Sequence, residues 1–170
     1  MIPRGEFAMI IPNQPYGLPR DDAMTLSDLE RAVREVLATG HIGTPVALRI
    51  HAAIPDFAGD PANALGIFEP LLRLISEKSN GKVLARKHPS GGHLSVLWTD
   101  ARGRTFFITL TTTPTCRQSL QVLLIGNHGI TRLTGAEAWE EDIPPAQTPL
   151  WSQEIAQSLK QGTSIPVPTS

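Results

Sequence analysis

Three apolar runs rich in β-branched residues lie in the second half of the chain, and they predict strands. They are Phe106–Leu110, Leu120–Ile125 and Ile130–Leu133, each bounded by the Gly, Pro, Thr or Asn residues that commonly end strands. The loop Gly126–Gly129 is short enough for a tight hairpin, because Gly and Asn tolerate positive φ. We therefore predict a three-stranded antiparallel meander in the middle of a larger sheet.

The N-terminal half alternates between helical and extended patterns. Apolar residues recur at helical spacing before Gly40, which suits a C-cap: Leu26, Leu29, Val33, Val36 and Leu37. A strand is predicted over Val46–Ile54. A second helical pattern runs from Ala62 to Glu77. Pro70 lies inside it and lacks an amide donor, which predicts a kink or a division into two short helices.

Further strands are predicted at Lys82–Lys87, Leu94–Trp98 and Thr105–Leu110, and a last amphipathic helix spans Leu150–Leu159. A helix, a strand, a helix and then a run of strands is typical of the α+β class. We predict an open-faced, mostly antiparallel sheet of about six strands with helices packed on one face. Residues 25–170 form this single domain, and residues 1–24 form an N-terminal extension that includes sequence of vector-derived appearance.

One face of such a sheet is left without helices. Because the predicted strands are strongly apolar, we expect this face to be too apolar for a soluble monomer. A second copy of the chain should then cover it, since most homo-oligomers are symmetric dimers. The pattern therefore predicts a homodimer formed through the open sheet face.

Composition narrows the function classes. The 170 residues carry 15 basic and 16 acidic side chains, so no basic field attracts nucleic acid or anionic lipid. Cys116 is the single cysteine, which excludes an internal disulfide and a cysteine-based zinc cluster. No apolar run approaches the ~18–20 residues of a membrane span. We expect a cytoplasmic protein without nucleic-acid or membrane partners.

Three motifs resemble a known family. A helix, Gly40-His41-Ile42-Gly43-Thr44-Pro45 and a strand follow one another within Leu29–Ala52; LLIGNHG occupies Leu123–Gly129; WSQEIAQSLKQGTSIPV occupies Trp151–Val167. Their order resembles the C-terminal domain of the Gfo/Idh/MocA family, the glucose–fructose oxidoreductases and inositol dehydrogenases. The resemblance implies an open-faced sheet whose uncovered face commonly builds the dimer contact.

The same resemblance shows what this sequence lacks. Family enzymes bind a nicotinamide cofactor through the Gly-rich turn of an N-terminal Rossmann domain, and this sequence has no G-x-G-x-x-G. The family's catalytic lysine, in an E-K-P motif of that domain, has no counterpart. The family's Asp–His pair would fall within Ala62–Arg73, which holds Asn63 and Glu69 but no histidine. We predict a stand-alone or truncated domain without an NAD(P) site, working with a second copy and with a Rossmann-containing partner or upstream domain.

A second hypothesis is a hydrolase of a sugar-like or lactone substrate, in which a divalent metal or a His–carboxylate pair activates water. Its candidate residues are His51, His88, His93, Asp56 and Asp60. A hairpin at Pro89–Gly92 would bring His88 and His93 together, with Asp100 as a third metal ligand. Exposed strand, turn and capping roles explain the same residues. A third hypothesis is a polyol-binding module without catalysis.

Overall fold

The computed structural model describes residues 26–55, 61–76, 80–116, 118–135 and 152–167. The helical elements are α1 (Leu26–Thr39), α2 (Pro61–Ala64), a 3-10 turn η1 (Leu65–Phe68), α3 (Glu69–Ile75) and α4 (Ser152–Gln161). The strands are β1 (Pro45–Ala53), β2 (Gly81–Lys87), β3 (His93–Asp100), β4 (Thr105–Thr111), β5 (Ser119–Gly126), β6 (Ile130–Gly135) and β7 (Ile165–Val167). They form a seven-stranded sheet in the order β6-β5-β1-β4-β3-β2-β7.

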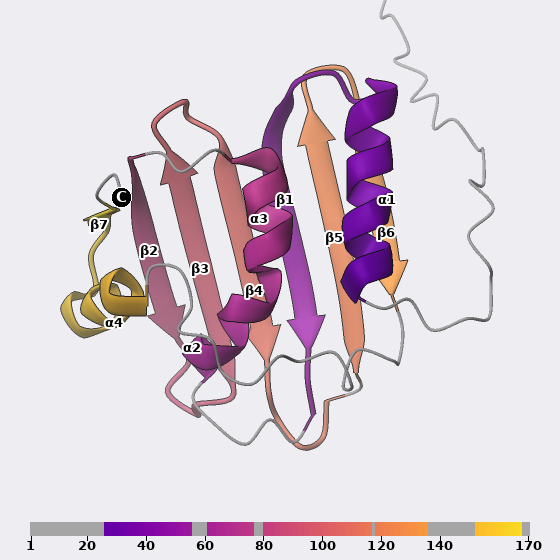
Figure 1. The fold of residues 1–170 in the computed structure, drawn as a ribbon. Coiled ribbons are helices and arrows are strands. Elements are labelled where there is room, and N and C mark those ends of the chain that lie inside the picture. Colours follow the sequence, from indigo (N-terminus) through magenta and orange to yellow (C-terminus); the bar gives the residue numbers. More distant parts are fainter. Residues whose placement is uncertain (1–25, 56–60, 77–79, 117, 136–151, 168–170) are drawn as a thin grey trace, which may run out of the picture.

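Helices and sheet form two layers, as the sequence pattern predicts. Figure 1 shows α1 and α3 on the same side of the sheet, with α4 beside β2 and β7 at one edge of the sheet. The core lies between the layers, because alternate strand residues point at the helices and are buried: Leu48 and Ile50 of β1, Val96 and Trp98 of β3, Phe106 and Leu110 of β4, and Val122 and Leu124 of β5. The α+β class with an open-faced sheet is therefore confirmed.

The predicted meander is only half right. The hairpin between β5 and β6 exists, with Ile125 opposite Ile130. However, β4 does not pair with β5, because β1 lies between them, parallel to β4 and antiparallel to β5. Residues 112–118 connect β4 to β5, which is enough chain to step across one strand. A strand's own pattern does not reveal its neighbours, so sequence proximity gave the wrong pairing here.

The sheet also has one strand more than the six predicted. The C-terminal segment Ile165–Val167 pairs antiparallel with the start of β2, with Ile165 opposite Val83. Its burial alternates, since Ile165 and Val167 are buried and Pro166 is exposed. Pro166 suits this edge position, because a strand at a sheet edge does not need every amide donor.

The region around Pro70 is divided into short helical pieces, as predicted. Helix α2, the turn η1 and helix α3 follow one another without a break in the chain. Pro70 lies at the first turn of α3, where its missing amide would have had no helical acceptor. The buried side chains of this region are Leu65, Ile67, Phe68, Leu71, Leu72 and Ile75.

Ser158 of α4 covers the edge of β2 beyond the end of β7. The Ala85 amide donates to Ser158 Oγ at 2.9 Å, and Ser158 Oγ donates to the Thr163 carbonyl at 2.6 Å. Ser158 is fully buried. We expect Ser158→Ala to reduce the free energy of unfolding by about 1–3 kcal/mol, because a buried amide loses its acceptor. Urea unfolding measures this loss, and exposed Gln157→Ala on the same helix is the control.

Candidate functional site

The side of the sheet without described helices presents three rows of side chains that cross it from β6 to β2, and we call it the open face. One of these rows begins with Ile130 on β6 and ends with Lys82 on β2. Strand register places a second row across the sheet from β6 to β2: Arg132, Leu123, Arg49, Phe107, Leu97 and Leu84. The neighbouring row is more polar: Thr134, Gln121, His51, Thr109, Ser95 and Arg86. All three rows come from strand positions that alternate with the core residues.

The open face is amphipathic, which corrects the expectation of a uniformly apolar surface. Leu97 is 37% exposed and Ile130 is 65% exposed, whereas Phe107 and Leu123 are half-buried. Arg49 interrupts the apolar row between Leu123 and Phe107. Treating each apolar run as a whole overestimates the hydrophobicity of this face, because alternate residues of a strand belong to opposite faces.

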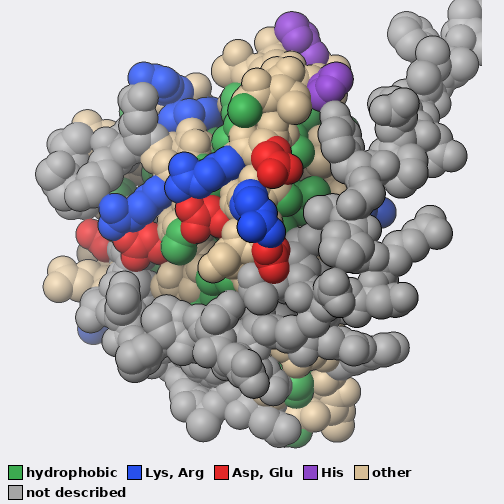
Figure 2. Space-filling view, turned by 45° about the vertical axis from the view of Figure 1, so that its right-hand side comes forward, with side chains coloured by type: hydrophobic (Ala, Val, Ile, Leu, Met, Phe, Trp, Pro, Cys, Tyr) green, Lys and Arg blue, Asp and Glu red, His purple; other side chains and the backbone are tan. Residues whose placement is uncertain are grey.

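The open face is also basic. Its Lys and Arg residues are exposed and make no ion pair with any described residue: Arg49, Lys82, Arg86 and Arg132. On the helical side, by contrast, acidic and basic side chains lie intermixed (Figure 2). There Arg34 pairs with Glu30 at 2.6 Å, and Arg31 pairs with Asp28. The near-zero net charge therefore hides an uneven distribution between the two faces.

His51, a candidate catalytic residue, lies in the middle of the open face. Its Nδ1 is hydrogen-bonded to Thr109 Oγ1 on the neighbouring strand β4. Its ring also stands edge-on to Phe107, with the ring centroids 6.4 Å apart. Both contacts orient the ring, and neither supplies a carboxylate to act with it.

The hairpin between β2 and β3 brings the backbones of His88 and His93 together, since the His88 amide donates to the His93 carbonyl at 2.9 Å. Their side chains have different partners. His88 Nδ1 lies 2.8 Å from Ser90 Oγ, and His93 Nδ1 lies 3.0 Å from Thr111 Oγ1. Asp100 lies at the opposite end of β3 from His93, so the three suggested metal ligands do not come together.

Asp56 and Asp60 lie outside the described residues. Within the described part of the chain, no group of three or more His, Cys, Asp or Glu residues is placed to hold a metal ion. None of the described helices has both the length and the apolar character needed to cross a membrane. At the position where the family resemblance implies an Asp–His pair, Glu69 instead pairs with Arg73.

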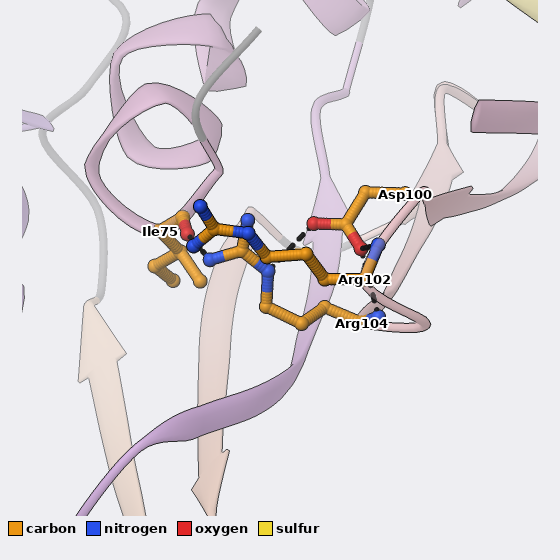
Figure 3. Close-up of polar contacts among 4 residues, drawn as sticks. All are labelled: Ile75, Asp100, Arg102 and Arg104. Atoms are coloured by element: carbon orange, nitrogen blue, oxygen red, sulfur yellow. Dashed lines mark hydrogen bonds and ion pairs between the residues drawn. The ribbon is translucent and has the colours of Figure 1, made fainter. Parts of the chain in front are cut away.

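Asp100 and Arg104 form a buried ion pair at the β3–β4 turn (Figure 3). The Asp100 carboxylate accepts a hydrogen bond from Arg104 Nε at 2.6 Å and two from the backbone amides of Arg102 and Arg104, both at 2.9 Å. Arg104 also donates to the carbonyl of Ile75 at the end of α3. The ion pair therefore ties helix α3 to the β3–β4 hairpin, which is a structural role rather than metal binding.

The two glycine-containing motifs of the sequence analysis meet in space. The Asn127 amide donates to the Thr44 carbonyl and the His128 amide donates to the Ile42 carbonyl, both at 3.0 Å. The Thr44 amide in turn donates to Asn127 Oδ1 at 2.8 Å. These bonds join the loop before β1 to the β5–β6 hairpin. Both motifs therefore fix the start of β1 in the sheet.

Solved inositol dehydrogenases share this fold. The myo-inositol dehydrogenase from Lactobacillus casei, solved with NAD(H) and myo-inositol, matches 83% of this chain with a TM-score of 0.60 at 14% identity. A myo-inositol dehydrogenase from Corynebacterium glutamicum also matches 83% of the chain, with a TM-score of 0.58 at 12% identity. The matched regions span 59% and 62% of those two proteins. No family model and no curated protein matches the sequence. At these identities the likeness shows the fold.

Proposed function

We propose that this chain is a C-terminal, substrate-binding and dimerisation type of domain from a Gfo/Idh/MocA-like oxidoreductase, without an NAD(P) site of its own. The observation that carries the proposal is the sheet with helices on one side, shared with two inositol dehydrogenases. The order of the three sequence motifs supports it independently. Two of these motifs form the hydrogen-bonded junction between residues 42–44 and 127–128.

The redox chemistry of such a protein needs a second unit. A Rossmann-type domain, either upstream in the same gene product or in a partner chain, supplies the nicotinamide site. This domain supplies two things: a sheet that supports the other unit, and a surface for association. His51, His88 and His93 have separate hydroxyl partners and no shared carboxylate among the described residues. This is consistent with a domain that leaves the redox chemistry to the other unit.

The open face is the proposed self-association surface, and it pairs with a second copy of the chain. Its central apolar residues, Leu97 and Phe107, lie opposite each other on β3 and β4. Around them the half-buried side chains of Leu84 and Leu123 extend the apolar row. Burying these side chains against a second copy provides the favourable free energy of association.

Leu97→Lys should therefore weaken self-association at least tenfold, because it removes an apolar contact and adds a like charge, a loss of ~1.4 kcal/mol or more. Sedimentation equilibrium measures the dimer dissociation constant. Ala38→Lys is the control: Ala38 is an exposed apolar residue on helix α1, which lies on the other side of the sheet. A wild-type protein that stays monomeric at micromolar concentration, or equal effects of both variants, would contradict the proposed surface.

A further inference from the structure

The four basic side chains of the open face have no acidic partner among the residues that the structure describes. Asp100 is the acidic residue found among the described strands, and it lies on the helix-covered side, bonded to Arg104. The side chains of Arg49, Lys82, Arg86 and Arg132 make no hydrogen bond to any described residue. Each of these four cations is exposed and hydrated in a single copy of the domain.

Pairing two copies through the open face changes the surroundings of these cations. A two-fold dimer places the same surface on both sides of the interface. Whatever the direction of the axis, the strand cations of one copy can then meet only neutral or basic strand side chains of the other. Burying a charge without a partner is unfavourable, so an anion that neutralises these strand cations favours pairing.

Arg49 and Arg132 are placed to bind such an anion. They lie in one row on β1 and β6 with Leu123 of β5 between them. Two strand spacings separate them, which is about 10 Å between Cα atoms. Gln121 and His51 occupy the neighbouring row on β5 and β1 and add polar groups beside the two arginines. Guanidinium groups bind oxyanions through paired N–H···O bonds, which suits a phosphate-type or sulfate-type group.

We propose that Arg49 and Arg132 form an oxyanion site, and that a doubly charged oxyanion bound there promotes the pairing of two copies through the open face. This inference rests on the proposed self-association. The bound anion neutralises the arginines before they are buried. A ligand that binds the dimer better than the monomer shifts the equilibrium toward the dimer.

The test is the dimer dissociation constant in chloride and in about 10 mM sulfate at matched ionic strength, so that general screening is equal in both buffers. We expect sulfate to lower the constant about tenfold for the wild-type chain. The double variant Arg49→Gln/Arg132→Gln should dimerise in chloride about as well as the wild type does in sulfate, and sulfate should not change it. Arg34→Gln on α1, away from the open face, is the control and should respond like the wild type.

The outcomes separate the two proposals. If the wild type dimerises equally in both salts, the oxyanion site is wrong and the proposed self-association stands. If the double variant keeps the sulfate response, sulfate is acting through general exclusion from protein surfaces, and the site is again wrong. If the wild type is monomeric in both salts, the proposed self-association fails, and the anion-linked pairing fails with it.

Discussion

Asp100→Ala should lower the free energy of unfolding by about 3–5 kcal/mol, because it leaves a buried guanidinium without its counter-charge. The Asp100 side chain is fully buried and that of Arg104 is 14% exposed. The substitution also removes the acceptor for two backbone amides in the β3–β4 turn. One terminal nitrogen of Arg104 is already buried without a described acceptor, so the charge has little else to compensate it.

Urea unfolding measures this effect, and Glu69→Gln is the matched control. Glu69 and Arg73 also form a carboxylate–guanidinium pair four residues apart, but the Arg73 side chain is 56% exposed. Because exposed pairs are screened by water, Glu69→Gln should change stability by about 1 kcal/mol or less. Equal losses for the two variants would contradict a stabilising role that depends on burial.

The double variant Asp100→Ala/Arg104→Leu separates charge from packing. Removing both members of a buried pair leaves no uncompensated charge, so much of the loss in the single variant should be recovered. The carbonyl of Ile75 loses its donor in this variant, which prevents full recovery. A double variant less stable than Asp100→Ala would show that the contact with helix α3 dominates.

Much of the fold could be predicted from the sequence, because alternation and helical spacing report directly on local structure. The helix ending at Gly40 and the strand starting near Val46 were predicted within one residue of their observed bounds. The insertion of β1 between β4 and β5 could not be predicted this way. Strand pairing depends on contacts between distant segments, and these leave no local pattern.

The chemistry of the site was harder to predict. Asp100 was predicted as a possible metal ligand because carboxylates bind cations. In the structure its carboxylate instead pairs with Arg104. Arg49 and Arg132 were missed, because each occurs as a single basic residue in an apolar strand. Alternation along each strand places both arginines on the face opposite the core. This placement becomes informative only when the strand register aligns them in one row.

Gly126→Ala should be the most disruptive small substitution outside the core, with a loss of about 3 kcal/mol in the free energy of unfolding. A Cβ at this position would lie 2.0 Å from the Ile42 carbonyl oxygen and 2.8 Å from its carbon. These are backbone atoms, so the loop before β1 must move. Moving it weakens the bonds that the Asn127 and His128 amides donate to that loop.

Two other glycines provide controls with graded expectations. Gly103→Ala has no atom within 4 Å of its new Cβ but keeps a φ of +79°, so it should lose only about 1 kcal/mol. Gly43→Ala combines a φ of +69° with close contacts to Asn127 Oδ1 and to the His128 ring. Both belong to side chains, which can move more easily than backbone, although Asn127 then loses the bond from the Thr44 amide. The loss for Gly43→Ala should fall between the other two. If urea unfolding gives Gly126→Ala and Gly103→Ala the same stability, the close approach of the two loops does not hold β1 in place.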